Sequence, residues 1–123
     1  MIPRTMVTVV DDDESVRESL PDLLQELGYA ARAYASAEEF LASGSVMDTH
    51  CLILDVAMPG MSGPELQRAL LHQGHTIPTI FITALADKSL PPGMMQRGAV
   101  DRLLKPFSEQ DLRDALAAAL PRI

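Results

Sequence analysis

Short apolar runs alternate along the chain with longer segments in which apolar residues recur every three or four positions. The short runs predict strands, and the three- and four-residue spacing predicts helices. Five strands are expected, at residues 7–10, 30–34, 51–55, 79–83 and 100–104. Because each strand is followed by a helical segment, the chain predicts an α/β fold: a doubly wound parallel sheet with right-handed crossovers and helices on both faces.

Polar residues and glycines mark where these helices begin and end. Gly28 is expected to end the first helix, and Pro21 inside it predicts a kink. Ser36 and Ser108 are suited to capping the second and last helices, and Pro64 to the first turn of the third. The second strand, at 30–34, is weakly patterned and is expected near an edge of the sheet.

The segment at residues 87–97 does not fit the alternation well. Its centre reads Leu90-Pro91-Pro92-Gly93, and residues before proline avoid helical geometry. We expect a loop through Gly93 and then one or two helical turns that Gly98 closes.

The most informative strand is Cys51-Leu52-Ile53-Leu54-Asp55, in which four apolar residues run directly into one carboxylate. A continuous apolar run predicts a strand that is buried on both faces. Asp55 would then lie at the carboxyl end of a central parallel strand, where open α/β sheets bind their ligands.

Polar residues follow the other strands at the same edge of the predicted sheet. They are Asp11 and Asp12 after the first strand, Asp55 after the third, Thr83 after the fourth and Lys105 after the fifth. Two carboxylates about 4 Å apart repel by roughly 4 kcal/mol at an effective dielectric constant near 20, so a cation is needed. Lys105 supplies one positive charge, and Mg²⁺ typically binds one or two carboxylates. A metal and a lysine beside Asp55 predict phosphoryl transfer with this carboxylate as the nucleophile.

Composition limits the classes of protein to be considered. A chain of 123 residues with 47% hydrophobic and 22% charged residues is expected to form a single domain, residues 1–123. The net charge of −7 and the lack of a basic cluster argue against nucleic-acid binding. The apolar runs are too short to cross a bilayer and the N-terminus lacks a signal-peptide pattern, so we expect a cytoplasmic protein without membrane contact. Cys51 is expected to be a buried, unreactive thiol.

Four motifs resemble those of the receiver domains of bacterial response regulators, especially the nitrogen-fixation and nodulation regulators. They are Val-Val-Asp-Asp-Asp at 9–13, Leu-Asp-Val-Ala-Met-Pro-Gly-Met-Ser-Gly at 54–63, Ile-Thr-Ala at 82–84 and Leu-Lys-Pro-Phe at 104–107. The resemblance covers residues 5 to 120. It implies a flavodoxin-like receiver fold with strand order 2-1-3-4-5.

The resemblance also implies roles for individual residues. Asp55 would be the phosphoacceptor and, with Asp12, would bind Mg²⁺ directly. Asp11 would act on the metal mainly through water, and the backbone carbonyl of Ala57 would complete the protein ligands.

A second set of residues would act on the phosphoryl group. Lys105 would pair with its oxygens, Thr83 would move to hydrogen-bond one of them, and the Ala84 amide would hold another. The Lys105-Pro106 peptide bond is expected to be cis, as is usual in the family.

Two positions depart from the family pattern. Arg102 stands where receivers usually carry Tyr or Phe; it is either a solvated residue or one that exchanges between solvent and Asp87 or Asp101. Ala57 and Leu85 occupy the positions that influence the hydrolytic water, and neither side chain can hydrogen-bond a water, so we expect slow self-dephosphorylation.

The expected function is a phosphorylation-controlled signalling switch that modifies only itself and is not an enzyme with a separate product. A sensor histidine kinase would be one partner, and an output domain or an effector protein would be the second partner. Dimerisation that depends on phosphorylation is left open. A phosphatase with an aspartyl-phosphate intermediate is an alternative, but it would need an acid where Ala57 stands. A second alternative is a pure interaction module with an inactive site, but the presence of all the site residues argues against it. A longer parent chain would make this domain part of a transcription factor or of a kinase.

Overall fold

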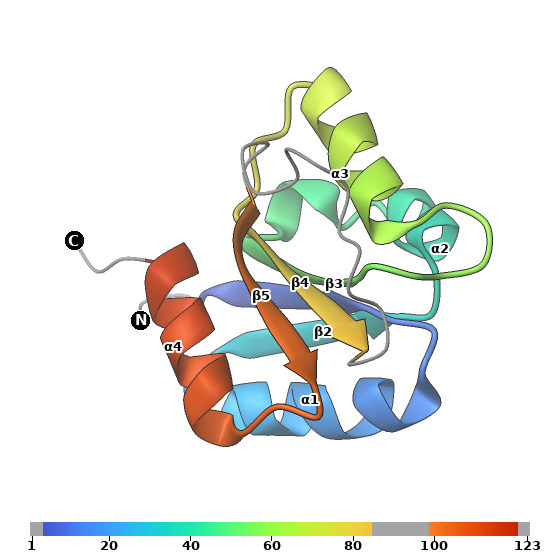
Figure 1. The fold of residues 1–123 in the computed structure, drawn as a ribbon. Helices are drawn as coiled ribbons and strands as arrows, with labels where there is room; N and C mark the ends of the chain where they lie inside the picture. Colours follow the sequence, from blue (N-terminus) through green and yellow to red (C-terminus); the bar gives the residue numbers. More distant parts are fainter. Residues whose placement is uncertain (1–3, 85–98, 121–123) are drawn as a thin grey trace.

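A parallel five-stranded sheet forms the centre of the computed structural model, which describes residues 4–84 and 99–120 (Figure 1). Its strands are β1 (Met6–Val10), β2 (Ala30–Tyr34), β3 (Cys51–Asp55), β4 (Thr79–Ala84) and β5 (Ala99–Lys105). They lie in the order β2-β1-β3-β4-β5, and all neighbouring pairs are parallel. The predicted strand order is therefore confirmed, and β2 is an edge strand as expected.

Helices cover both faces of this sheet, as the alternating pattern predicts (Figure 1). The helices are α1 (Glu14–Glu26), α2 (Ala37–Ala42), α3 (Gly63–His72) and α4 (Glu109–Ala119), and a short 3-10 turn, η1, spans Val46–Asp48. Helices α1 and α4 lie on one face, and α2 and α3 on the other. Pro21 lies inside α1. The loop and short helix expected at 87–97 lie outside the described residues.

Two apolar clusters fill the spaces between the sheet and its helices. Leu24 and Leu116 join β1, β3 and β4 on the α1 and α4 face, whereas Phe40 and Leu66 pack against Leu54 and neighbouring side chains on the other. Fully burying one such side chain stabilises the fold by about 1.5–3 kcal/mol. All residues of β3 are buried, so the prediction of a strand covered on both faces is confirmed.

The buried thiol of Cys51 was also predicted correctly. Its side chain is fully buried, and burial raises the pKa of this thiol to about 12. The thiolate is therefore scarce at neutral pH, as expected of a structural rather than a reactive cysteine.

The helix ends follow local capping chemistry. Ser36 caps α2 by accepting a hydrogen bond from the Glu39 amide, and Ser108 forms a capping box with Asp111 at α4. At α3 the cap is Ser62, one residue before the predicted Gly63-Pro64 start. No helix within the described segments is both long enough and apolar enough to span a membrane.

Candidate functional site

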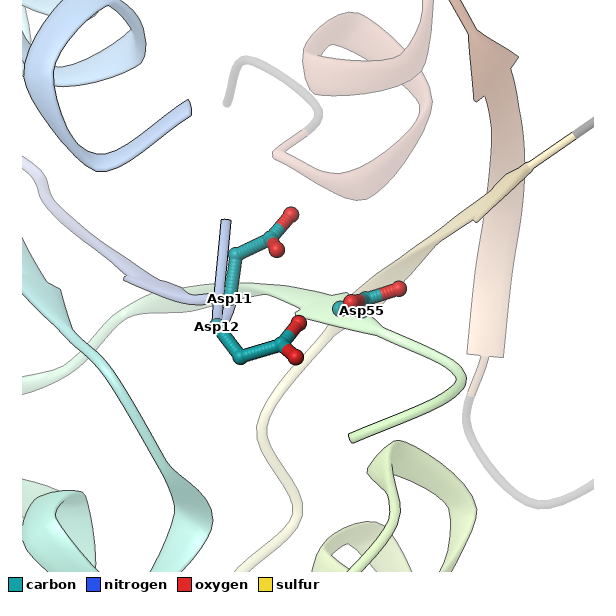
Figure 2. Close-up of side chains that lie close together, drawn as sticks. All are labelled: Asp11, Asp12 and Asp55. Carbon is teal, nitrogen blue, oxygen red and sulfur yellow. The ribbon is translucent and has the colours of Figure 1, made fainter. Parts of the chain in front are cut away.

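Three carboxylates meet where β1 and β3 end (Figure 2). Asp11 and Asp12 directly follow β1, and Asp55 is the last residue of β3. Val10 pairs with Leu54 across these parallel strands, so the residues that follow them lie side by side. One carboxylate oxygen from each aspartate lies within 4.8 Å of the others. The predicted convergence of these three residues is thus observed.

Asp11 is held deep in this site. Its side chain is fully buried, and its Oδ1 accepts a hydrogen bond of 2.9 Å from the Asp13 amide. Oδ2 lies 3.0 Å from the Lys105 ammonium, yet it accepts no well-aligned hydrogen bond from the described residues. The two groups form an ion pair at this distance, and Oδ2 remains able to accept a further contact. Such an atom suits a hydrated cation.

Lys105, the last residue of β5, brings positive charge to the carboxylates. Its Nζ lies 3.0 Å from Asp11 Oδ2 and 3.9 Å from Asp13 Oδ2. Partial burial lowers the pKa of Lys105, but hydrogen bonding with Asp11 and the negative charges of Asp11, Asp55 and Asp13 together outweigh burial, so the net effect raises this pKa. The peptide bond between Lys105 and Pro106 is cis, as expected.

Asp55 has a strongly perturbed acidity. Burial is the main cause, followed by the negative charge of Asp11 and hydrogen bonding with Asp12, and together they raise the pKa of Asp55 from 3.8 to about 7. The Lys105 charge opposes this shift without cancelling it. A further positive charge close to Asp55 would favour the ionised form of this carboxylate.

The donor set fits a small, hard divalent cation. Mg²⁺ prefers oxygen ligands and keeps several waters, so it needs only a few carboxylates and one open side. Asp11 is fully buried and Asp55 is 7% exposed, whereas Asp12 is exposed and leaves the cluster accessible to solvent. No histidine belongs to a metal-competent group in the described parts of the chain. His50, for example, accepts a hydrogen bond from the Met6 amide at Nδ1.

The remaining predicted site residues lie on the same edge of the sheet. Thr83 is 2% exposed and follows Ile82, the residue of β4 that pairs with Asp55. Ala84 ends β4 and pairs in register with Lys105. Ala57 is exposed in the loop that follows β3.

Other predicted positions have different outcomes. Arg102 is exposed on β5, but the side chains of Asp87 and Asp101, its suggested partners, lie outside the described part, as does Leu85. Asp13 caps α1 by accepting a hydrogen bond from the Ser15 amide.

Sequence reasoning did not find several contacts around the site. Arg17 donates a 3.0 Å hydrogen bond to the Asp11 carbonyl oxygen, and the start of α3 lies so close to β3 that a Cβ on Gly63 would overlap the Asp55 carbonyl oxygen. Glu38 Oε2 accepts a 3.0 Å hydrogen bond from the Met61 amide. The glycine between a serine cap and a proline was a usable signal for close packing, whereas the other contacts join positions that no local motif connects.

Known proteins carry the same combination of fold and motifs. The sequence model of the response regulator receiver domain matches residues 7–117. Nodulation protein W of Bradyrhizobium diazoefficiens is 44% identical over 97% of this chain and 52% of its own length. The transcriptional regulatory protein FixJ of Azorhizobium caulinodans is 41% identical over 94% of this chain and 55% of its own length. The chain thus spans about half the length of these curated relatives.

Solved structures agree with this assignment. The crystal structure of FixJ-N superposes with a TM-score of 0.85 at 37% identity and covers 99% of this chain and 98% of its own. The response regulator StyR gives a TM-score of 0.88 at 44% identity over 95% of this chain and 59% of its own. The chain belongs to the receiver domains of two-component response regulators.

Proposed function

We propose that Asp55 accepts a phosphoryl group and that the phosphorylated domain acts as a signalling switch. The observation that supports this most strongly is the grouping of three carboxylates within 4.8 Å, with a lysine ammonium 3.0 Å from one of them. Such a site combines a nucleophile, metal ligands and a fixed cation at one edge of a rigid sheet.

Mg²⁺ would be held directly by the side chains of Asp12 and Asp55 and by the backbone carbonyl of Ala57, and mainly through water by Asp11. When bound, it would supply the positive charge that screens the carboxylates and the phosphoryl oxygens from one another. It would also favour the ionised form of Asp55, whose pKa is otherwise raised to about 7.

The transfer step forms one bond and breaks one. A carboxylate oxygen of Asp55 attacks the phosphorus of a phosphohistidine, the P–N bond breaks, and the leaving imidazole takes a proton from solvent. Lys105 would turn from Asp11 towards the phosphoryl oxygens, and the Thr83 hydroxyl and the Ala84 amide would donate to the others. Each of these donors stabilises charge on the moving group.

The aspartyl phosphate would then shift a conformational equilibrium that a partner reads. The donor would be a sensor histidine kinase, and the product stays on the protein, so the domain modifies itself and releases no separate product. Residues 1–123 would form one receiver domain. Since its relatives are about twice as long, its output would be an attached domain or a separate effector, with a phosphorylation-dependent dimer as one form of response.

Incubation with acetyl phosphate, followed by intact-protein mass measurement, tests this function. We expect one phosphoryl group per chain in the presence of Mg²⁺, none with excess EDTA, and none on Asp55→Asn. Glu39→Gln, an exposed change on α2, serves as the control and should be modified like wild type. Equal modification of Asp55→Asn, or no modification of wild type, would show the proposal to be wrong.

A further inference from the structure

The loop at residues 56–62 joins β3 to α3 and contains Ala57. Its base is fixed, because the Gly63 amide donates a 3.2 Å hydrogen bond to the Val56 carbonyl oxygen. Met58 anchors the first half, since its side chain is buried in the apolar cluster beneath α2 and α3. The Met61 side chain also packs against this cluster, so apolar contacts hold one side of the loop, whose tip is formed by residues 59–61.

A side chain from another element holds that tip. Glu38, in the first turn of α2, accepts a 3.0 Å hydrogen bond from the Met61 amide at Oε2. Gly60 passes the same oxygen so closely that an added Cβ would lie 2.7 Å from it. Gly60 also has a φ of +76°, which side chains adopt only at a cost. The tip of the loop is therefore shaped around the Glu38 carboxylate.

We propose that Glu38 is a positioning residue for the metal site, because its hydrogen bond to the loop fixes the direction of the Ala57 carbonyl. This inference rests on the proposed function, in which that carbonyl is a ligand. A carboxylate that accepts from a backbone amide makes a charge-assisted hydrogen bond, roughly twice as strong as a neutral one. Losing it would weaken the hold on the tip of the loop, and with it the hold on the direction of the Ala57 carbonyl.

The stability of α2 does not by itself explain this contact. The α2 N-terminus already has its cap, because the Ser36 hydroxyl accepts a hydrogen bond from the Glu39 amide. An acid in the first turn interacts favourably with the helix dipole, but Glu39 lies in that turn as well. The two glutamates thus share their helix, exposure and charge, and differ in that Glu38 hydrogen-bonds the loop.

The pair provides a matched experiment, in which Mg²⁺ affinity is measured by calorimetric titration. We expect Glu38→Ala to weaken Mg²⁺ binding about fivefold, or about 1 kcal/mol, relative to Glu39→Ala. Both variants lose one negative charge from α2, so the difference between them excludes a general electrostatic effect. Glu38→Gln keeps an acceptor oxygen and should bind within about twofold of wild type.

Amide hydrogen exchange gives a readout that is independent of the metal. The Met61 amide should exchange faster in Glu38→Ala than in wild type, Glu38→Gln or Glu39→Ala, all measured without Mg²⁺. Because Glu38 is exposed, we expect the circular dichroism spectrum and the melting temperature of Glu38→Ala to match those of Glu39→Ala.

Gly60→Ala tests the same contact from the loop side. Its methyl group would displace the Glu38 carboxylate and weaken Mg²⁺ binding in the wild-type background. In the Glu38→Ala background the same change should cost less, because there is no carboxylate left to displace. Equal costs in the two backgrounds would contradict the proposal.

The outcomes separate this inference from the function on which it rests. Wild-type protein that binds Mg²⁺ and becomes phosphorylated, together with equal Mg²⁺ affinity of Glu38→Ala and Glu39→Ala, would overturn the role of Glu38 alone. Wild-type protein that does neither would overturn both.

Discussion

Lys105 Nζ lies 3.0 Å from Asp11 Oδ2, a side-chain oxygen that is fully buried. The lysine therefore neutralises part of the acidic cluster in the unphosphorylated form. Its side chain is 23% exposed, so it lies close enough to solvent to change partners. A bound metal ion would serve the same purpose as the lysine, because each would offset the repulsion between the carboxylates.

Lys105→Met should therefore lower stability in a way that Mg²⁺ corrects. Removing one partner of a buried ion pair lowers the free energy of unfolding by roughly 3 kcal/mol. Because Lys105 is partly exposed, we expect a loss of this size or smaller. Denaturant unfolding in EDTA should show the loss, and saturating Mg²⁺ should stabilise the variant more than wild type. Lys105→Arg keeps the charge and should lose less. A Mg²⁺ effect of equal size in Lys105→Met and wild type would contradict the shared role.

The raised pKa of Asp55 predicts how stability depends on pH. Its folded-state pKa of about 7 exceeds the ordinary 3.8, so between these values the folded protein holds a proton that the unfolded chain has lost. The free energy of unfolding should then fall as the pH rises from about 4 to 7. At about 1.4 kcal/mol per unit, the loss amounts to a few kcal/mol. The pKa of Lys105, raised above 10.5, adds no slope in this range.

Unfolding of wild type and Asp55→Asn at pH 5 and pH 8, both in EDTA, would measure this slope. The asparagine does not titrate, so wild type should lose more stability than the variant over the interval. Saturating Mg²⁺ should remove the difference by favouring the carboxylate. Parallel profiles of the two proteins in EDTA would show that Asp55 titrates normally.

The sequence predicted those parts of the structure that follow from local patterns. Residues 30–34 and 51–55 were assigned to strands with the observed limits, because apolar runs and turn residues delimit them. Asp11, Asp12 and Asp55 could be brought together from sequence because parallel strands end at one edge of the sheet. The strand order required the family resemblance, since periodicity does not say which strands are neighbours.

Contacts between distant elements could not be predicted in the same way. Glu38 and Met61 are 23 positions apart, and their contact depends on the geometry of both α2 and the loop. Likewise, Lys105 was expected to offset the repulsion between the carboxylates, but the sequence did not say which of them would be its 3.0 Å partner. By contrast, the start of α3 at Gly63, with Pro64 in its first turn, follows from a local pattern and was predicted correctly.

Gly63→Ala should disturb both stability and the site. A Cβ on Gly63 would overlap the carbonyl oxygen of Asp55 and come within 3.1 Å of its carbonyl carbon. These are backbone atoms of a central strand, so α3 must shift instead, which typically costs about 1–3 kcal/mol. Gly74→Ala is a suitable control, because a Cβ on Gly74 meets nothing within 4 Å and only its φ of +85° is unfavourable.

Both glycine variants should be less stable than wild type in denaturant unfolding. Only Gly63→Ala should also weaken Mg²⁺ binding and slow modification by acetyl phosphate, because of the two glycines only Gly63 lies against the Asp55 backbone. Wild-type Mg²⁺ affinity in Gly63→Ala would mean that the strand end and α3 can separate without disturbing the site.

The small side chain of Ala57 predicts a long-lived phosphoryl group. Ala57 is exposed two residues after Asp55, and its methyl group cannot hydrogen-bond the water that would attack the phosphorus. We expect a half-life well beyond seconds for the phosphorylated wild-type domain. Ala57→Asn adds an amide that can orient this water, so it should lose its phosphoryl group several-fold faster. Decay of the phosphorylated species after removal of acetyl phosphate, followed by intact mass, measures both rates.

Ala57→Val, which adds bulk without a polar group, controls for simple crowding and should not accelerate the decay. Equal acceleration by valine and asparagine would show that access to the phosphorus, rather than orientation of the water, sets the lifetime.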